Sequence, residues 1–289
     1  MRPVARPGSS LLGGTQVARD RPAGPAAPGD ATRNAPVIVL APPYGGASPL
    51  GSLLARHPDL ACTAGTGLLP LCEQAMATWR RTDGRAGGPP SALATASTRA
   101  LAASIIGSLL ARAGKQRWCE VATANSAAAE TFLDLYRGTR FVCLHRACAA
   151  VIRTALNASP WGIADPALAP FTRAYPASTV AALAACWVIH TEALLTFEQA
   201  YPQACLRVRF EDLTGAQHET TQKVTTFLGL TSIDGQTMPG EGSQPQPAPE
   251  SPGHETDIPA GLIPPGILEQ ANDLLRQLSY PALATPTAG

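Results

Sequence analysis

The stretch VIVLAPPYGGASPLGSLL, residues 37–54, decides how this chain folds. An apolar run typical of a buried strand passes through a turn of small residues into a segment with leucines at helical spacing. Such a strand–turn–helix unit points several backbone N–H groups at one place, where the positive end of the helix also lies. The stretch therefore predicts an anion site of the kind that binds phosphate. The turn holds no lysine or arginine, so it offers an anion no counter-charge of its own.

Short apolar runs and amphipathic segments alternate along the rest of the chain. We expect strands at 36–41, 117–121, 140–145 and 206–210, and helices at 49–56, 92–112, 127–136, 147–158, 177–200 and 266–279, with another helix ending at 228 and mixed helical spacing over 65–79. Ser48 is the expected cap of the first helix. The helix at 92–112 is indicated by Leu101, Ile105 and Leu109, which repeat every fourth residue, with Ile106 and Leu110 beside them. Strands that alternate with helices imply parallel pairing through right-handed crossovers. The expected fold class is α/β, a short parallel sheet flanked by helices in three layers.

Composition divides the chain into four parts. Residues 1–34 are rich in Pro, Gly, Ala and Arg and are expected to form a disordered leader. The α/β domain is expected at 35–230, a flexible Pro/Gly-rich segment at 231–265, and a C-terminal helix with its tail at 266–289. Four prolines between 159 and 176 predict a loop inside the domain.

Charge and cysteine usage limit the classes of function. A net charge of +1 with no basic stripe argues against a nucleic-acid partner. The seven cysteines form no CxxC pair and have no histidine at metal spacing, so we expect reduced, buried thiols, no metal and a reducing compartment. We see neither a signal-length apolar block at the N-terminus nor a membrane-spanning stretch, and we therefore expect a cytoplasmic protein with no membrane partner.

Further candidate residues stand where strands are expected to end, which is where ligands bind in parallel sheets. Arg146 follows the strand at 140–145, and Thr154 stands two helical turns later. A guanidinium fork and a hydroxyl make a phosphate clamp, because the fork matches two oxygens at once; a surface ion pair would also explain an isolated arginine. The candidate general bases are His145, beside this clamp, and His190, within the helix at 177–200. A kinase-type P-loop is disfavoured, since the turn lacks the lysine of GxxxxGK[ST].

Six motifs in order resemble the sulfotransferase family, which uses 3′-phosphoadenosine-5′-phosphosulfate as donor. They are Ala-Pro-Pro-x-x-Gly-x-Ser-x-Leu at 41–50 followed by His-Pro-Asp-Leu at 57–60, Trp-Cys-Glu at 118–120, Arg-Phe-Val-Cys-Leu-His-Arg at 140–146, Pro-Trp-Gly at 160–162, Arg-Phe-Glu-Asp-Leu at 209–213, and Phe-Leu-Gly-Leu at 227–230. The likeness spans residues 36–230 and is nearest to bacterial members that act on small molecules.

The resemblance implies a P-loop-like sulfotransferase fold and a role for each motif. The turn, comprising Tyr44, Gly45, Gly46, Ala47 and Ser48, would hold the 5′-phosphosulfate of the donor. Arg146 and Thr154 would hold its 3′-phosphate, and the element at 209–212 would be structural. The implied reaction transfers a sulfuryl group to a hydroxyl or amine of a small molecule, without a metal, and natural-product biosynthesis is the implied setting by analogy.

Two departures from the family pattern leave a second function open. Tyr44 stands where the family generally has Lys or Arg, and Val121 stands where relatives with the Trp-Cys-acidic run commonly have Lys. Each lost cation costs about 2.7–4 kcal/mol of transition-state stabilisation, by analogy with a lost oxyanion-hole donor. The alternative to a donor-using sulfotransferase is a repurposed or non-catalytic protein that kept the fold and lost the use of the donor.

Overall fold

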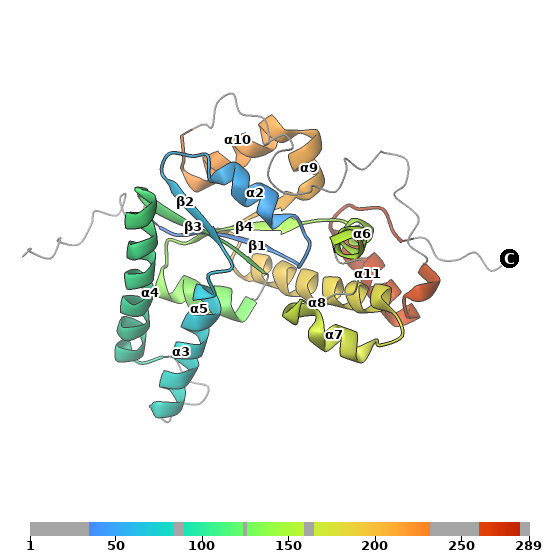
Figure 1. Cartoon of the computed structure of the whole chain (residues 1–289), viewed down its shortest axis with the longest axis horizontal. Helices are drawn as coiled ribbons and strands as arrows, with labels where there is room; N and C mark the ends of the chain where they lie inside the picture. The colour runs from blue at the N-terminus through green and yellow to red at the C-terminus, as the bar shows by residue number, and fades with distance from the viewer. Residues whose placement is uncertain (1–34, 84–89, 124–125, 159–164, 232–259, 284–289) are drawn as a thin grey trace, which may run out of the picture.

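A five-stranded parallel sheet forms the centre of the molecule (Figure 1). The computed structural model describes residues 35–83, 90–123, 126–158, 165–231 and 260–283. The strands are β1 (Val37–Ala41), β2 (Leu60–Ala64), β3 (Arg117–Thr123), β4 (Arg140–His145) and β5 (Cys205–Arg209), in the spatial order β2-β3-β1-β4-β5. The sheet confirms the expected α/β class.

Helices cover both faces of this sheet. They are α2 (Ala47–Leu54), α3 (Leu68–Thr82), α4 (Ala92–Ala113), α5 (Ser126–Leu135), α6 (Cys148–Ala158), α7 (Ala169–Ala174), α8 (Thr179–Ala200), α9 (Phe210–Gly215), α10 (Gln217–Leu228) and α11 (Pro265–Gln277), with short 3-10 turns η1 (Pro166–Leu168) and η2 (Ala260–Leu262). Ile38 and Leu40 of β1 face a core shared with α3, α4, α5 and α8, whereas Val37 and Val39 face a core shared with α2, α9 and α10. Both faces of β1 are therefore buried, as expected for a central parallel strand.

A third apolar cluster lies beyond the carboxyl ends of the strands. It joins α6, the N-terminal half of α8 and α11, and it includes Trp187, Leu268 and Leu275 (Figure 1). The helix expected at 266–279 is therefore α11, and it packs on α8 as part of the same body. By length and composition, α4 and α8 are apolar enough to cross a membrane, contrary to the expectation that no stretch would be. Of the 18-residue apolar stretch in α8, 67% is buried inside the protein, whereas 22% of the corresponding stretch in α4 is buried.

Several local expectations were wrong. The first helix begins at Ala47 behind a left-handed Gly46, so Ser48 is its second residue and not its cap. The edge strand β2 was missed, because only Leu60 and Ala61 of its five residues are buried and its apolar pattern is weak. In the proline-rich stretch, α7 forms with Pro170 in its first turn, where a missing N–H costs nothing.

The buried stripe of α4 is shifted by one residue from the apolar repeat seen in the sequence. Ala94, Thr98, Ala102 and Ile106 face the core, and Leu101 is 42% exposed. Small residues occupy this face because α3 and α5 pack against α4 there. The expected leader at 1–34 and most of the segment 231–265 lie outside the described residues.

A buried arginine joins the residue before β1 to the end of α10. Arg117 is 2% exposed, and its guanidinium donates to the carbonyl oxygens of Ala35 and Leu228. Burial lowers the pKa of this guanidinium, and the two carbonyl bonds compensate part of its lost hydration.

Candidate functional site

The topology brings two turns together at one place on the sheet. The chain leaves β1 toward β2 on one side and leaves β4 toward β5 on the other, so the strand order reverses between β1 and β4. In open α/β sheets this switch point forms a crevice at the carboxyl ends of the strands. The β1–α2 turn, residues 42–46, and the β4–α6 turn, residues 146–147, both lie here.

The β1–α2 turn is held in an unusual backbone conformation. Tyr44 has φ 60° and Gly46 has φ 88°, and the Gly45 N–H donates to the Pro42 carbonyl at 2.9 Å. The Gly46 cap makes no side-chain hydrogen bond, which leaves the first amides of α2 without a side-chain acceptor. A Cβ at Gly46 would lie 2.2 Å from the ring of Phe210, so only glycine fits between the turn and this ring.

Arg146 lies against the β1–α2 turn. Its Nη1 is 3.4 Å from the Tyr44 carbonyl oxygen, and its guanidinium carbon is 4.2 Å from the centroid of the Phe210 ring. Only 8% of the residue is exposed. The structure thus brings Arg146 and the turn at 44–48 together, and it places the cation that the turn lacks beside the turn's backbone.

The backbone around Arg146 is fixed by three side chains from distant parts of the chain. The Trp187 Nε1–H donates to the Arg146 carbonyl at 3.0 Å, and the Ala147 N–H donates to Glu211 Oε1 at 3.1 Å. The Tyr280 hydroxyl lies 3.1 Å from the His145 carbonyl oxygen and 2.6 Å from Glu211 Oε2. Sequence reasoning singled out none of these anchors as site residues, since each lies at least 41 positions from its partner.

Thr154 stands on α6, two turns after Arg146, as expected. The residue is half-buried, and its Oγ1 is buried with no hydrogen-bond partner in the part of the chain that the structure describes. A buried hydroxyl without a partner is costly unless a ligand or water satisfies it. The structure therefore leaves this hydroxyl open to a ligand oxygen or a water, as it does the uncapped start of α2.

The two candidate bases lie in different surroundings. His145 is 1% exposed, and its Nε2 is 2.6 Å from Glu198 Oε1, which leaves the ring out of reach of an acceptor. The other oxygen of Glu198 binds Arg207 at 2.6 Å, so the carboxylate is shared between His145 and Arg207. This burial argues against His145 as a general base. His190 is half-buried on α8, with its ring 6.3 Å from that of Phe171.

Apolar contacts surround the positions where the family pattern has cations. Tyr44 packs against the cluster formed by α6, α8 and α11. Val121 of β3 packs against α2. The contact is so close that a Cβ at Gly51 would lie 2.5 Å from the Cγ2 of Val121. Lys115 is held elsewhere, because its Nζ donates to the His57 carbonyl at 3.0 Å. The described residues hold no cluster of three or more metal-ligating side chains.

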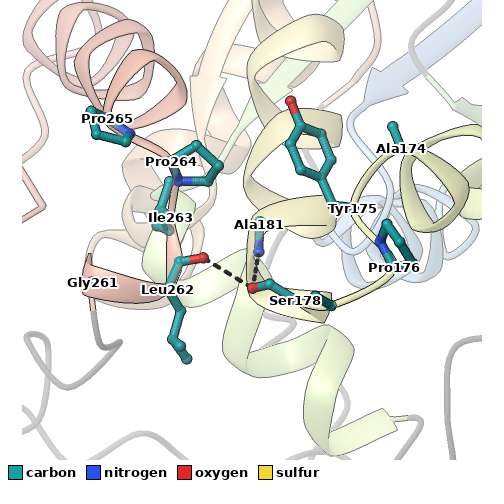
Figure 2. A pocket seen from close by; sticks show the side chains of 11 residues that line it. Ala174, Tyr175, Pro176, Ser178, Ala181, Gly261, Leu262, Ile263, Pro264 and Pro265 are labelled. Carbon is teal, nitrogen blue, oxygen red and sulfur yellow. Dashed lines mark hydrogen bonds between the residues drawn. The ribbon is translucent and has the colours of Figure 1, made fainter.

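A separate pocket of about 400 Å³ lies at the far end of the third cluster (Figure 2). The turn before α8 and the start of the C-terminal segment line it, with Tyr175, Pro176, Ile263 and Pro264 facing one another across it. Ala181 lines this pocket six residues before Trp187, which places it about 9 Å along α8 from the Arg146 anchor at ~1.5 Å per residue. Among the residues that line the pocket there is none from the β1–α2 turn or the β4–α6 turn.

Comparison with known proteins identifies the family. The family model described as the sulfotransferase family matches residues 36–234, more than half of the chain. The protein therefore belongs to the sulfotransferase family, whose members generally use 3′-phosphoadenosine-5′-phosphosulfate as donor. No curated protein matches the sequence.

Solved structures show the same fold at low sequence identity. The sulfotransferase domain from the curacin biosynthetic pathway aligns with a TM-score of 0.51 at 14% identity, covering 86% of this chain and 98% of that domain. The sulfotransferase domain of the Synechococcus PCC 7002 olefin synthase aligns with a TM-score of 0.51 at 18% identity, covering 85% of this chain and 95% of that domain. A sulfotransferase from Alicyclobacillus acidocaldarius aligns with a TM-score of 0.51 at 11% identity, covering 84% of this chain and 94% of that protein. These likenesses bear on the fold alone.

Proposed function

We propose that the protein transfers a sulfuryl group from 3′-phosphoadenosine-5′-phosphosulfate to a hydroxyl or amine of a small molecule, in the cytoplasm and as part of natural-product biosynthesis. The observation that carries the proposal is the 3.4 Å approach of Arg146 Nη1 to the Tyr44 carbonyl. It joins the two elements that the family uses to bind opposite ends of the donor. The family match over residues 36–234 supports the same reaction class.

In this proposal the chain's own residues bind and orient the donor. The uncapped amides of α2 and the hydroxyl of Ser48 face the phosphosulfate, and Thr154 and Arg146 bind the 3′-phosphate. Of the two histidines, His190 remains the candidate base, since it is half-exposed and lies on α8 one turn from Trp187.

The alternative function is a sulfotransferase fold that no longer uses the donor. It is favoured by the packing of Val121 against Gly51, which fills a family cation position with apolar contact. Tyr44 belongs to an apolar cluster in the same way. Under this alternative the crevice either catalyses a different reaction or belongs to a non-catalytic partner protein, and no sulfuryl group is transferred from the donor.

Calorimetry with adenosine 3′,5′-bisphosphate tests the binding half of the proposal. We expect binding by the wild-type protein and a loss of about tenfold to hundredfold in affinity for Arg146→Ala, since a charge-assisted hydrogen bond contributes roughly 1.5–3 kcal/mol. Arg81→Ala is the matched control, because Arg81 lies exposed at the end of α3 and bonds Thr78 of the same helix. Absence of binding by the wild type contradicts the proposal.

A transfer assay separates the enzyme from the alternative. Radiolabelled donor is mixed with the protein and a panel of phenols, alcohols and amines, and transfer above a no-enzyme control is expected. The double variant Tyr44→Arg and Val121→Lys is assayed beside it. Activity that appears only in the double variant would identify a fold that has lost donor use, in favour of the alternative.

A further inference from the structure

Tyr280 is a residue outside the family match that reaches the centre of the site. The match ends at residue 234, whereas Tyr280 follows α11 near the end of the described chain. It is 6% exposed and packs in the cluster formed by α6, α8 and α11. The Arg209 guanidinium lies over its ring, with 4.2 Å between the guanidinium carbon and the centroid. The aromatic ring is therefore held from two sides.

The hydroxyl of Tyr280 contacts two groups that flank Arg146 along the chain. It can donate its one proton to Glu211 Oε2 at 2.6 Å or to the His145 carbonyl at 3.1 Å. The shorter contact orients the Glu211 carboxylate, whose other oxygen accepts the Ala147 N–H. Burial and the neighbouring Glu211 raise the pKa of Tyr280, so the hydroxyl stays protonated and remains a donor.

The contacts form a chain that ends at the anion site. Tyr280 binds Glu211, Glu211 binds the peptide group between Arg146 and Ala147, and Arg146 extends from this peptide group to the Tyr44 carbonyl. We propose that Tyr280 is a positioning residue, through which the C-terminal segment sets the orientation of Arg146 in the anion site. The proposal rests on the proposed function in so far as the anion is a donor nucleotide.

Tyr280→Phe tests this role, because it removes one hydroxyl and keeps the ring under Arg209. We expect faster hydrogen exchange of the amides at 145–149 in the free protein and about tenfold weaker binding of adenosine 3′,5′-bisphosphate. Tyr201→Phe is the matched control, since the Tyr201 ring packs on Phe197 at the other end of α8. Leu274→Ala is the second control, because it loosens the packing of α11 and touches no polar group of the site.

The outcomes decide between positioning and packing. Exchange and affinity unchanged in Tyr280→Phe, or equally impaired in Leu274→Ala, would overturn the proposal. A wild-type protein that does not bind the nucleotide contradicts the proposed function only, and the exchange rates at 145–149 then test Tyr280 alone.

If Tyr280→Phe fails to fold, Glu211→Gln replaces it. The same acceleration of exchange is expected at 145–149, and the same outcomes decide. Where both fold, the double variant is expected to be no worse than the more impaired single one, because the two residues act through one contact.

Discussion

The two turns that meet in the crevice are stabilised in different ways. The β1–α2 turn is fixed by shape: Gly46 fits under the Phe210 ring, and Gly51 lies against Val121. The β4–α6 turn is fixed by polar side chains: the Trp187 Nε1–H donates to the Arg146 carbonyl, Glu211 accepts the Ala147 N–H, and Tyr280 orients Glu211. The close packing of the β1–α2 turn depends on glycines in the turn itself or in the helix after it. The side chains that anchor the β4–α6 turn come from distant positions in the sequence. The first kind of turn can be predicted from its own sequence, and the second cannot.

The largest effect is expected from Gly46→Ala, which tests whether shape fixes the β1–α2 turn. The new Cβ would meet the Phe210 ring at 2.2 Å in a backbone with φ 88°, so we expect a loss of about 3 kcal/mol in the free energy of unfolding. Urea unfolding measures it. Gly65→Ala is the matched control, since Gly65 has φ 64° but nothing within 4 Å of its Cβ position. Equal losses in the two variants would show that backbone strain alone matters and that Phe210 does not constrain the turn.

A smaller effect is expected from Gly51→Ala, which tests the packing at the family cation position. The Cβ would lie 2.5 Å from Val121 Cγ2, and we expect a net loss of about 1 kcal/mol after the gain in helix propensity. Gly107→Ala in α4 is the control, and we expect it to stabilise the protein. Its Cβ would meet nothing within 4 Å, so helix propensity alone should raise the free energy of unfolding by ~0.5–1 kcal/mol. A stabilised Gly51→Ala variant would mean that Val121 moves aside easily and that a lysine there would be tolerated.

The smallest effect concerns Cys148, which begins α6 and reports on the hydrogen-bonded turn. Burial raises the pKa of this thiol, so at pH 8 a smaller fraction is thiolate than in the unfolded chain, and alkylation should be slower. We expect iodoacetamide to modify the half-buried Cys62 and Cys205 before Cys148 in the folded protein, as measured by mass spectrometry. Early labelling of Cys148 would indicate that the turn opens despite its three anchors.

The fold could be predicted from the sequence where a pattern is strong over several residues. The apolar runs of β1, β3, β4 and β5 and the periodicity of α8 gave these elements to within about two residues. The edge strand β2 could not be found, because one of its edges is unpaired, only its first two residues are buried, and its residues Ala61 and Ala64 have little strand preference. The shifted stripe of α4 has a similar cause, since alanines carry no signal for which face is buried.

The candidate site could be predicted only in part, for a related reason. The glycines of the β1–α2 turn and the arginine after β4 stand at strand ends, so their proximity follows from parallel topology. The anchor Tyr280 carries no local pattern, and its role depends on α11 folding back over α8. His145 contacts Glu198, which lies 53 residues later in the chain. Partners at this sequence separation are set by packing and leave no local trace in the sequence.

The guanidinium of Arg117, which binds the carbonyl oxygens of Ala35 and Leu228 at once, has a topological consequence. Both points lie within reach of a single side chain, so the residue before β1 and the last residue of α10 are held side by side inside the protein. All five strands and the helices from α2 to α10 lie between these two points, so one side chain closes this part of the chain into a loop.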